Sequence, residues 1–416
     1  MEYLTIIGGV FVAWLILVTL FAPAIPYHVQ ETVDPRSDHF IQTLEATCNT
    51  SVDRHNHIEI FTNGPRFYPA MLDAIRHAEE TINLECYIFR KGEVAGQFVE
   101  ALCERARAGV QVKIVLDALG SIGAFRAFAP RLRAAGARVG KYRGISWHSL
   151  SRLNSRTHRE LLVVDSRVAF VGGAGVADWW AAPSDGKPMW RDMMARIEGP
   201  VVSNVQGVIA ENWLACSGEI LTSAKTYHPY RTAGSSPAFA IKSSPSDRAT
   251  LSRVLFQLLV ESATSRVQIS TPYFLPDKAF RRAFVDTARR GVDVRIIVPG
   301  PLTDQRWVRL ASRRNYGALL KAGVRIFEYG GMTHVKALLV DDLWSVIGTT
   351  NVDNRSFEHN DEVNVAVRDE TVTARLTADF ESDLESSREI TLKAWTHRPV
   401  WEKLVGTFAW ILERQQ

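Results

Sequence analysis

The sequence predicts an α/β protein of two similar lobes with mixed sheets, preceded by a transmembrane helix at the N-terminus. Two observations predict the lobes: strand patterns alternate with helix patterns, and the same order of patterns occurs twice along the chain. An uncharged apolar run near the first residue predicts the membrane helix. The economical arrangement relates the two copies by a pseudo-twofold axis and brings their matching hairpins together at the seam.

The first copy is expected within residues 58–216. A helix pattern precedes INLECYIF, whose continuous apolar residues are typical of a buried strand. GQFVEALCERARAGVQVKIVLD then combines an amphipathic helix, a glycine stop at Gly109 and a second strand. LRAAGARVGKY supplies a third strand, and the hairpin THRELLVVDSRVAFVGG follows.

The second copy is expected within residues 246–395 and repeats this order. LFQLLVESATSRVQISTPYF matches the first helix and strand, and FRRAFVDTARRGVDVRIIVPG matches the second pair. LLKAGVRIFEY supplies the third strand, and THVKALLVDDLWSVIGTT supplies the hairpin. Residues 217–245 are richer in Ser, Thr, Gly and Pro, so we expect a connector between the copies.

Residues 1–27 are expected to form a single-pass anchor in the cell membrane, because Tyr3 to Ala24 carries no charge. A cleaved signal peptide would have a basic start, and only Glu2 and the α-amino group precede this run. Neither flank has an excess of Lys or Arg, so the side of the globular part stays open. Residues 28–57 are polar and acidic, which predicts a linker.

The C-terminal residues 396–416, with Trp395 just before them, can form an amphipathic helix. One side of it would carry Trp395, Trp401, Leu404, Phe408 and Leu412. Tryptophans at such positions suit a membrane interface, but the same pattern suits a helix packed on the second lobe. Both interpretations stay open from the sequence.

Composition favours an anionic partner without choosing between phospholipid and nucleic acid, since the net charge is +4 and the isoelectric point is near 8.8. The four cysteines lack CxxC spacing, so no zinc site is implied. The glycines do not follow a nucleotide-binding order, and we predict no cofactor and no metal. Oligomeric state cannot be predicted from these features.

The stretch Thr333–Glu362 carries the most specific motif. His334 and Lys336 are two residues apart on an apolar strand, so both side chains leave one face. An imidazole can attack or move a proton near neutral pH, and a lysine can hold an anion. The order HxKxxxxD followed by GTxN resembles the phospholipase D superfamily, and NVDNRSFEHNDE is similar to bacterial cardiolipin synthases.

The resemblance covers about residues 58–395 and implies two phospholipase D-like lobes that share one phosphodiester site. It assigns one histidine to each lobe, His158 and His334, with Lys336 as the cation. By this analogy His158 attacks phosphorus to form a phosphohistidine, and His334 protonates the departing oxygen. The sequence itself leaves open which histidine attacks.

Each imidazole needs an acceptor for its second nitrogen. Aligning the copies places Asp192 opposite Glu362, so both are candidates for orienting carboxylates, with surface carboxylates as the alternative. Asp165 and Asp341 lie in the hairpin turns and are expected to cap them. Further candidates for contacts with phosphate or head group, or in the first two cases for strand-end capping, are Thr349, Asn351, Arg355 and Asn360.

The first copy departs from the family pattern at two positions. Glu160 stands where a lysine is expected, and Gly175 stands where the second copy has Asn351. A carboxylate there would put negative charge where the phosphate belongs. Either another cation compensates while Glu160 tunes His158 or binds a head-group hydroxyl, or this copy is silent. The compensating candidates are Lys336, Arg191, Arg355 and Arg156; the retained histidine and Gly172–Gly173 favour activity.

The leading hypothesis is a membrane-anchored phosphatidyltransferase of the cardiolipin synthase kind. It would join two phosphatidylglycerol molecules and release glycerol, with no nucleotide as energy source. The alternatives are a lipid hydrolase of phospholipase D type, a membrane-anchored nuclease and a silent membrane scaffold. Nucleic acid is disfavoured, because the basic run Arg306, Arg309, Arg313 and Arg314 would spread round a helix axis.

Overall fold

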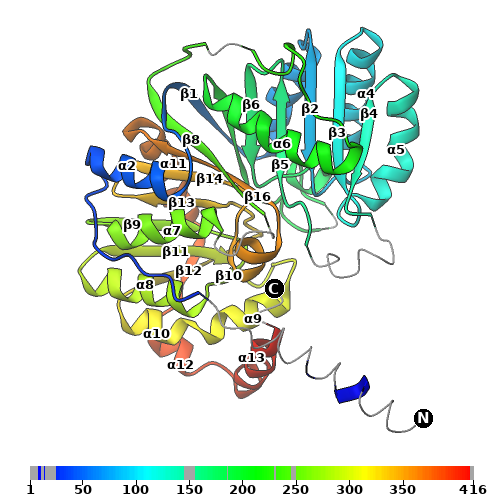
Figure 1. Ribbon diagram of the computed structural model, residues 1–416. Helices are drawn as coiled ribbons and strands as arrows, with labels where there is room; N and C mark the ends of the chain where they lie inside the picture. Colours follow the sequence, from blue (N-terminus) through cyan, green and yellow to red (C-terminus); the bar gives the residue numbers. More distant parts are fainter. Residues whose placement is uncertain are drawn as a thin grey trace.

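A computed structural model of the chain describes residues 8–10, 14, 25–144, 155–184, 186–228, 231–244 and 250–412. The two copies form the two halves of one 15-stranded sheet (Figure 1). From edge to edge the strand order is β17-β12-β11-β9-β13-β14-β16-β8-β1-β7-β6-β5-β2-β3-β4. Apart from the edge strand β17, the order reads the same in each half from the seam outwards, which confirms the predicted duplication.

The first half contains seven strands, with helices in the connections. Its order in the sheet is β4-β3-β2-β5-β6-β7-β1; β2, β3 and β4 pair in parallel and the other pairs are antiparallel. The elements are β1 (Asp53–Thr62), α3 (Gly64–Arg76), β2 (Thr81–Cys86), α4 (Glu93–Arg107), β3 (Gln111–Asp117), α5 (Ile122–Ala134), β4 (Arg138–Tyr142), β5 (Glu160–Val164), β6 (Val168–Gly172), β7 (Met193–Glu198) and α6 (Val201–Ser217).

The second half repeats this arrangement as β12-β11-β9-β13-β14-β16-β8, again with three parallel strands and antiparallel neighbours. Its elements are β8 (Ser236–Ser243), α7 (Leu251–Ser262), β9 (Arg266–Ser270), α8 (Lys278–Arg289), β11 (Asp293–Pro299), α9 (Arg306–Arg314), α10 (Tyr316–Lys321), β12 (Arg325–Tyr329), β13 (Ala337–Val340), β14 (Trp344–Gly348), β16 (Glu362–Arg368), α11 (Glu370–Glu385), β17 (Ser387–Glu389), α12 (Leu392–Thr396) and α13 (Val400–Leu412). A separate ribbon pairs β10 (Phe274–Leu275) with β15 (Val352–Asp353).

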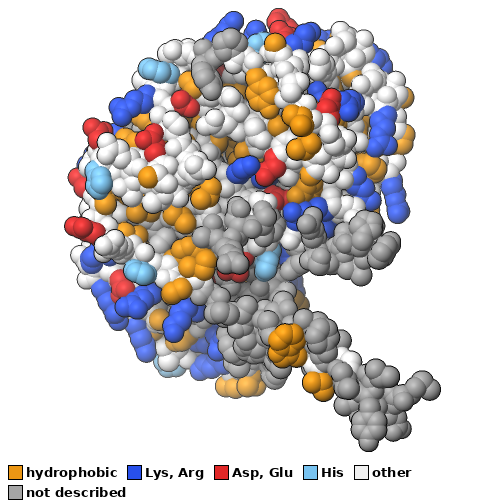
Figure 2. All heavy atoms as spheres, viewed as in Figure 1, with side chains coloured by type: hydrophobic (Ala, Val, Ile, Leu, Met, Phe, Trp, Pro, Cys, Tyr) orange, Lys and Arg blue, Asp and Glu red, His pale blue; other side chains and the backbone are white. Residues whose placement is uncertain are grey.

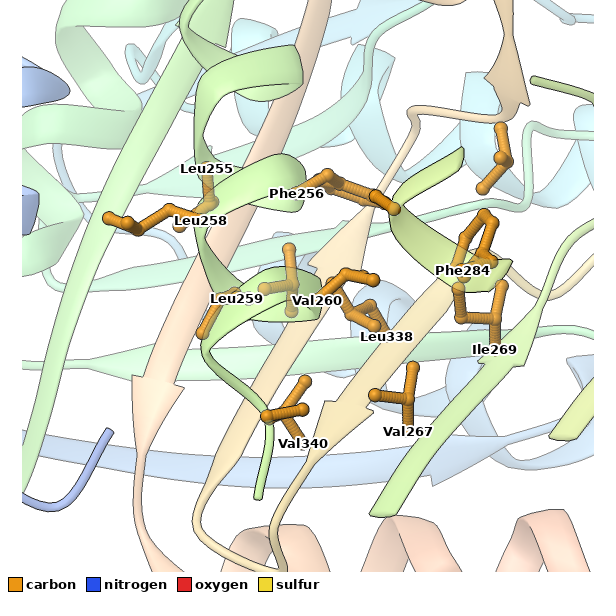
Figure 3. Close-up of a cluster of buried hydrophobic side chains, with 14 of the residues drawn as sticks. Leu255, Phe256, Leu258, Leu259, Val260, Val267, Ile269, Phe284, Leu338 and Val340 are labelled. Carbon is orange, nitrogen blue, oxygen red and sulfur yellow. The ribbon is translucent and has the colours of Figure 1, made fainter. Parts of the chain in front are cut away.

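Apolar cores lie on both faces of the sheet. In the second half, Leu255 and Leu259 of α7 share one core with Val267 of β9 and Leu338 of β13 (Figure 3). Another core is shared between the halves and joins residues of β5 and β6 to residues of β14, β16 and α11. Since burial of apolar area is the main favourable term in folding, this shared core holds the seam in place.

Residues 28–57 differ from the predicted linker, because they contain a packed helix, α2 (Asp38–Thr47). Its apolar face places Phe40, Ile41 and Leu44 in the core of the second half. The indole of Trp344 donates to the carbonyl of Pro35 at 2.9 Å. The segment is acidic on average, but its apolar residues lie on one face of the helix. Average composition does not show this arrangement. The first half likewise begins earlier than expected, and the expected connector contains β8.

The predictions for the two chain ends are checked to different extents by the described residues. The expected anchor lies outside the described residues except for 8–10 and Trp14, and no helix in the described ranges is long and apolar enough to cross a membrane. Near the C-terminus, α13 packs on α9, and Arg313 Nε donates to Glu402 Oε1 at 2.6 Å. Packing on the second half is therefore observed, while Trp401 remains 58% exposed on the outer side of α13.

Candidate active site

The two histidines reach the seam on segments that pair with the opposite half. Thr157 forms a parallel bridge with Asp361, and Arg191 forms one with Thr333. The amide of His158 donates to the carbonyl of Asp361 at 2.9 Å, and that of His334 donates to the carbonyl of Arg191 at 2.7 Å. Each histidine is thereby held beside a carboxylate-bearing segment of the other half.

The predicted orienting carboxylates pair with the histidines across the seam. His158 Nδ1 lies 3.1 Å from Glu362 Oε1 and 3.2 Å from Oε2, and His334 Nδ1 lies 2.9 Å from Asp192 Oδ2. Glu362 also accepts from the hydroxyl of Thr349, and from Asn360 Nδ2 at 3.4 Å. A carboxylate on Nδ1 fixes the ring orientation and assigns Nε2 to the reacting atoms.

Lys336 is buried against the ring of His334, with Nζ 2.9 Å from Nδ1 and 3.2 Å from Nε2. Burial lowers the pKa of Lys336. Burial and the neighbouring ammonium together lower the pKa of His334 well below its usual value. Burial raises the pKa of Asp192 to about 7. The His334–Asp192 pair therefore loses one proton as the pH rises through about 7.

A cavity of about 490 Å³ lies in front of both histidines. Aromatic rings form one wall: the Tyr87 ring is 5.1 Å from that of His158, and the Trp190 ring is 5.6 Å from that of His334. The polar part of the lining contains Arg90, Arg156, Arg355, Asn351, Asn360, Asp304 and Asp353. Cations and amide donors of this kind can hold phosphoryl oxygens.

The structure separates the remaining candidates into cavity-lining and supporting residues. Asn351, Arg355 and Asn360 line the cavity, whereas Thr349 supports Glu362. Asp165 and Asp341 are turn residues with φ of 50° and 55°. Both carboxylates accept amide hydrogen bonds from the segment that precedes a neighbouring strand: residues 79–81 for Asp165 and residues 264–266 for Asp341.

Glu160 is buried and is not among the residues that line the cavity. Its Oε1 accepts the amide hydrogen of Ile88 at 2.8 Å. Burial raises the pKa of this carboxyl well above its usual value. The effect of Glu160 on phosphate binding stays a prediction, since its carboxyl group contacts the Ile88 amide and is not part of the cavity lining. Among the proposed compensating cations, Arg156 and Arg355 reach the cavity, whereas Arg191 is bound to Asp383 at 2.8 Å.

The sequence interpretation missed several lining residues that share one position in the fold. Tyr87 directly follows β2, Tyr273 follows β9, and Asp304 follows β11. Ligand sites in α/β sheets lie beyond the carboxyl ends of parallel strands, so this rule would have indicated them. Between β6 and β7, Trp179 lies in a short 3₁₀ helix (Asp178–Trp180) and Trp190 in irregular chain, and no sequence signal assigns either to the site.

Comparison with known proteins agrees with this geometry. A family model described as the phospholipase D-like domain of cardiolipin synthase matches residues 71–183 and 257–384. Cardiolipin synthase of Alkalihalophilus pseudofirmus is 32% identical over 358 residues, covering 85% of this chain and 71% of the relative. The major cardiolipin synthase ClsA of Bacillus subtilis is 31% identical over 353 residues, covering 84% of this chain and 73% of the relative.

Among solved structures, phosphatidylserine synthase of Haemophilus influenzae superposes with a TM-score of 0.67 at 13% identity, covering 90% of this chain and 99% of that one. Polyphosphate kinase of Porphyromonas gingivalis superposes with a TM-score of 0.56 at 12% identity, covering 90% of this chain and 54% of that one. At such identities these two matches show the fold alone. The family model and the cardiolipin synthases, by contrast, show that the chain belongs to the phospholipase D-like cardiolipin synthase family and is a phosphatidyltransferase of the phospholipase D superfamily.

Proposed function

We propose that this protein is a cardiolipin synthase that joins two phosphatidylglycerol molecules and releases glycerol through a phosphohistidine intermediate. The observation that supports this most is the pair of histidines, each held by a carboxylate of the opposite half and both facing one cavity. Two imidazoles can divide the work of nucleophile and acid–base catalyst in a phosphodiester exchange. The similarity to cardiolipin synthases favours phospholipid substrates. Phosphatidylglycerol as donor and acceptor is part of the proposal.

In the proposed first step, His158 Nε2 attacks phosphorus and the bond to the glycerol oxygen breaks. The departing oxygen takes the proton held by the His334–Asp192 pair, and glycerol leaves. In the second step this pair removes the proton from a hydroxyl of another phosphatidylglycerol, whose oxygen attacks phosphorus and frees His158. Lys336, Arg156 and Arg355 are suited to balance charge on the phosphoryl oxygens in both steps.

The pH dependence follows from the shared proton. The pKa of Asp192 is about 7, so the pair loses its proton as the pH rises through neutrality. We expect the rate of transfer to fall on this alkaline side, because the leaving oxygen then lacks a proton donor. In Asp192→Asn the amide does not titrate, so the fall in rate at alkaline pH should disappear, although the rate is lower at every pH. If the rate of that variant still fell at alkaline pH as in the wild type, the proton donor would not be the His334–Asp192 pair.

We also propose that the protein is attached to the cell membrane by residues 1–27. The uncharged run from Tyr3 to Ala24 supports this. Further support comes from the exposed apolar side chains near the cavity: Trp307 is 63% exposed on α9, next to the lining residue Val308, and α13 beside it exposes Val400, Trp401 and Leu404. A membrane-facing surface at this position would let a lipid head group enter without leaving the bilayer.

A nuclease would need a continuous basic track with stacking aromatic side chains. On the face in Figure 2, basic side chains gather over α8 at the left and over α5 at the right, and acidic side chains interrupt the basic ones between them. This distribution favours lipid over nucleic acid as the substrate. Hydrolysis by water is the closer alternative, since it would use the same histidines.

The test is turnover of phosphatidylglycerol by protein extracted from the membrane fraction, beside His158→Ala and His334→Ala. We expect diphosphatidyl lipid and glycerol, with a loss of at least about 10³-fold in each variant. If phosphatidic acid were the main product, the protein would be a hydrolase and not a transferase.

A second experiment tests the anchor. When residues 1–24 are removed, the protein should no longer be recovered in the membrane fraction. If the truncated protein stays in that fraction, the proposed anchor is wrong.

A further inference from the structure

Asp304 is a carboxylate in the wall of the active-site cavity. It lies in the loop between β11 and α9, and its neighbours Gln305 and Val308 also line the cavity. The phenol of Tyr273, another lining residue, donates to Asp304 Oδ2 at 2.7 Å. Among the residues that the structure describes, no Lys, Arg or His is placed as an ion-pair partner of Asp304.

Within its own loop the carboxylate of Asp304 contacts the hydroxyl of Thr303, which lies 3.4 Å from Oδ1, and among the described residues no backbone amide donates to it. α9 begins without a side-chain cap, and the amide of Gln305 is satisfied by Thr303 Oγ1 at 3.2 Å. Asp353, the other lining carboxylate, does have such a structural contact, because its Oδ1 accepts the amide hydrogen of Ser356 at 2.7 Å. Asp304 instead has acceptor capacity left over, since a carboxylate offers about four lone-pair sites.

A carboxylate at this position works against phosphate binding. Its charge reaches the catalytic groups, because it partly offsets the lowering of the pKa of His334 and of Lys336 that burial causes. A site for a phosphodiester gains nothing from an added negative charge unless another part of the substrate uses it. That part must bring hydrogen-bond donors, and it must sit next to the phosphate, as a lipid head group does.

We propose that Asp304, oriented by Tyr273, binds the hydroxyl groups of a neutral polyol head group and so selects polyol phospholipids as substrates. This rests on the proposed function and specifies its substrate class. A head group with an ammonium would also offer donors, but Arg90, Arg156 and Arg355 line the same cavity and repel a cation. Hydroxyl groups donate to the carboxylate without that repulsion, and a hydrogen bond to a charged acceptor is among the stronger ones.

Binding measured without turnover tests this assignment. In a His158→Ala background, which leaves the lipid unconverted, calorimetry would give the Kd of short-chain phosphatidylglycerol and of phosphatidylmethanol, whose head group has no hydroxyl. We expect phosphatidylglycerol to bind more tightly by about tenfold or more. Asp304→Ala should bring the ratio of the two Kd values close to one, and Tyr273→Phe should lower it partly.

Asp286→Asn is the matched control, because this carboxylate lies on α8 of the same half, outside the cavity, and pairs with Arg282. It should leave the ratio unchanged. Equal weakening of both lipids by Asp304→Ala would overturn the proposal, since that is the effect of tuning His334 alone. A selective loss for phosphatidylethanolamine would overturn it too, because the occupant would then be an ammonium.

The two proposals can fail separately. If the wild-type protein forms no diphosphatidyl lipid but the Kd ratio falls in Asp304→Ala, the polyol site stands and the synthase assignment falls. If diphosphatidyl lipid forms while the Kd ratio is unaffected by Asp304→Ala, the synthase assignment stands and the polyol site falls.

Discussion

Replacing Glu362 by Gln is expected to lower phosphatidyl transfer by about 10³- to 10⁴-fold, the scale seen when a catalytic histidine loses its carboxylate. Both carboxylate oxygens of Glu362 lie within 3.2 Å of His158 Nδ1. A Gln amide can turn its NH₂ group toward this nitrogen, which favours the tautomer that carries the proton on Nε2 and blocks attack on phosphorus. The residue comes from the opposite half of the chain, so the loss would show that the halves share their catalytic groups.

Steady-state rates and the free energy of unfolding should be measured together on this variant. Stability should change much less than the rate, because Gln retains the volume of Glu362 and can accept the Thr349 hydroxyl. Glu385→Gln on α11 is a suitable control, since that side chain is exposed and should alter neither quantity. A rate within about tenfold of wild type for Glu362→Gln would show that His158 does not depend on this carboxylate.

Replacing Gly175 by Ala is expected to destabilise the folded protein by about 3 kcal/mol or more, as overpacking against rigid backbone does. A Cβ there would lie 2.3 Å from the carbonyl oxygen of Ile88 and 2.8 Å from Glu160 Oε1. The carbonyl cannot move easily, because it accepts the amide hydrogen of Val176 at 2.8 Å. Gly175 and Glu160 therefore form one packing unit, and the two departures from the family pattern belong together.

Urea denaturation of Gly175→Ala beside Gly96→Ala would measure this effect. Gly96 lies in α4 with nothing within 4 Å of an added Cβ, so alanine there should stabilise the protein by about 0.5–1 kcal/mol. Similar free energies of unfolding for wild type and Gly175→Ala would mean that the Ile88 segment can shift. The premise that Glu160 is packed in a fixed position would then fail.

Local patterns determine most of what could be predicted here. The apolar run INLECYIF and its counterpart VQISTPYF indicated equivalent strands because burial on both faces leaves a continuous apolar sequence. The spacing of His334 and Lys336 indicated one face of a strand, because side chains two apart in a strand point the same way. In the structure both residues precede the strand, which begins at Ala337. The packed helix α2 escaped notice, since three apolar residues among acidic ones are a weak signal without the core that they enter.

Two features of the site depend on tertiary structure alone. Alignment of the copies showed that Asp192 and Glu362 are equivalent. It did not show that each carboxylate binds the histidine of the other half, which follows from the bridges Thr157–Asp361 and Arg191–Thr333 between distant segments. The raised pKa of Glu160 depends on its burial, which the sequence does not show. In both cases the deciding quantity is a contact between parts of the chain that the sequence does not place.

The exchanged partners also bear on how this protein moves. Each half carries a histidine whose carboxylate belongs to its neighbour, so a fluctuation that parts the seam disconnects both dyads in the same event. Partial opening cannot leave one dyad intact while the other is lost, unless a half deforms internally. Both dyads are therefore intact only in molecules whose seam is closed. The free energy of opening the seam sets the fraction of such molecules, and only these can react.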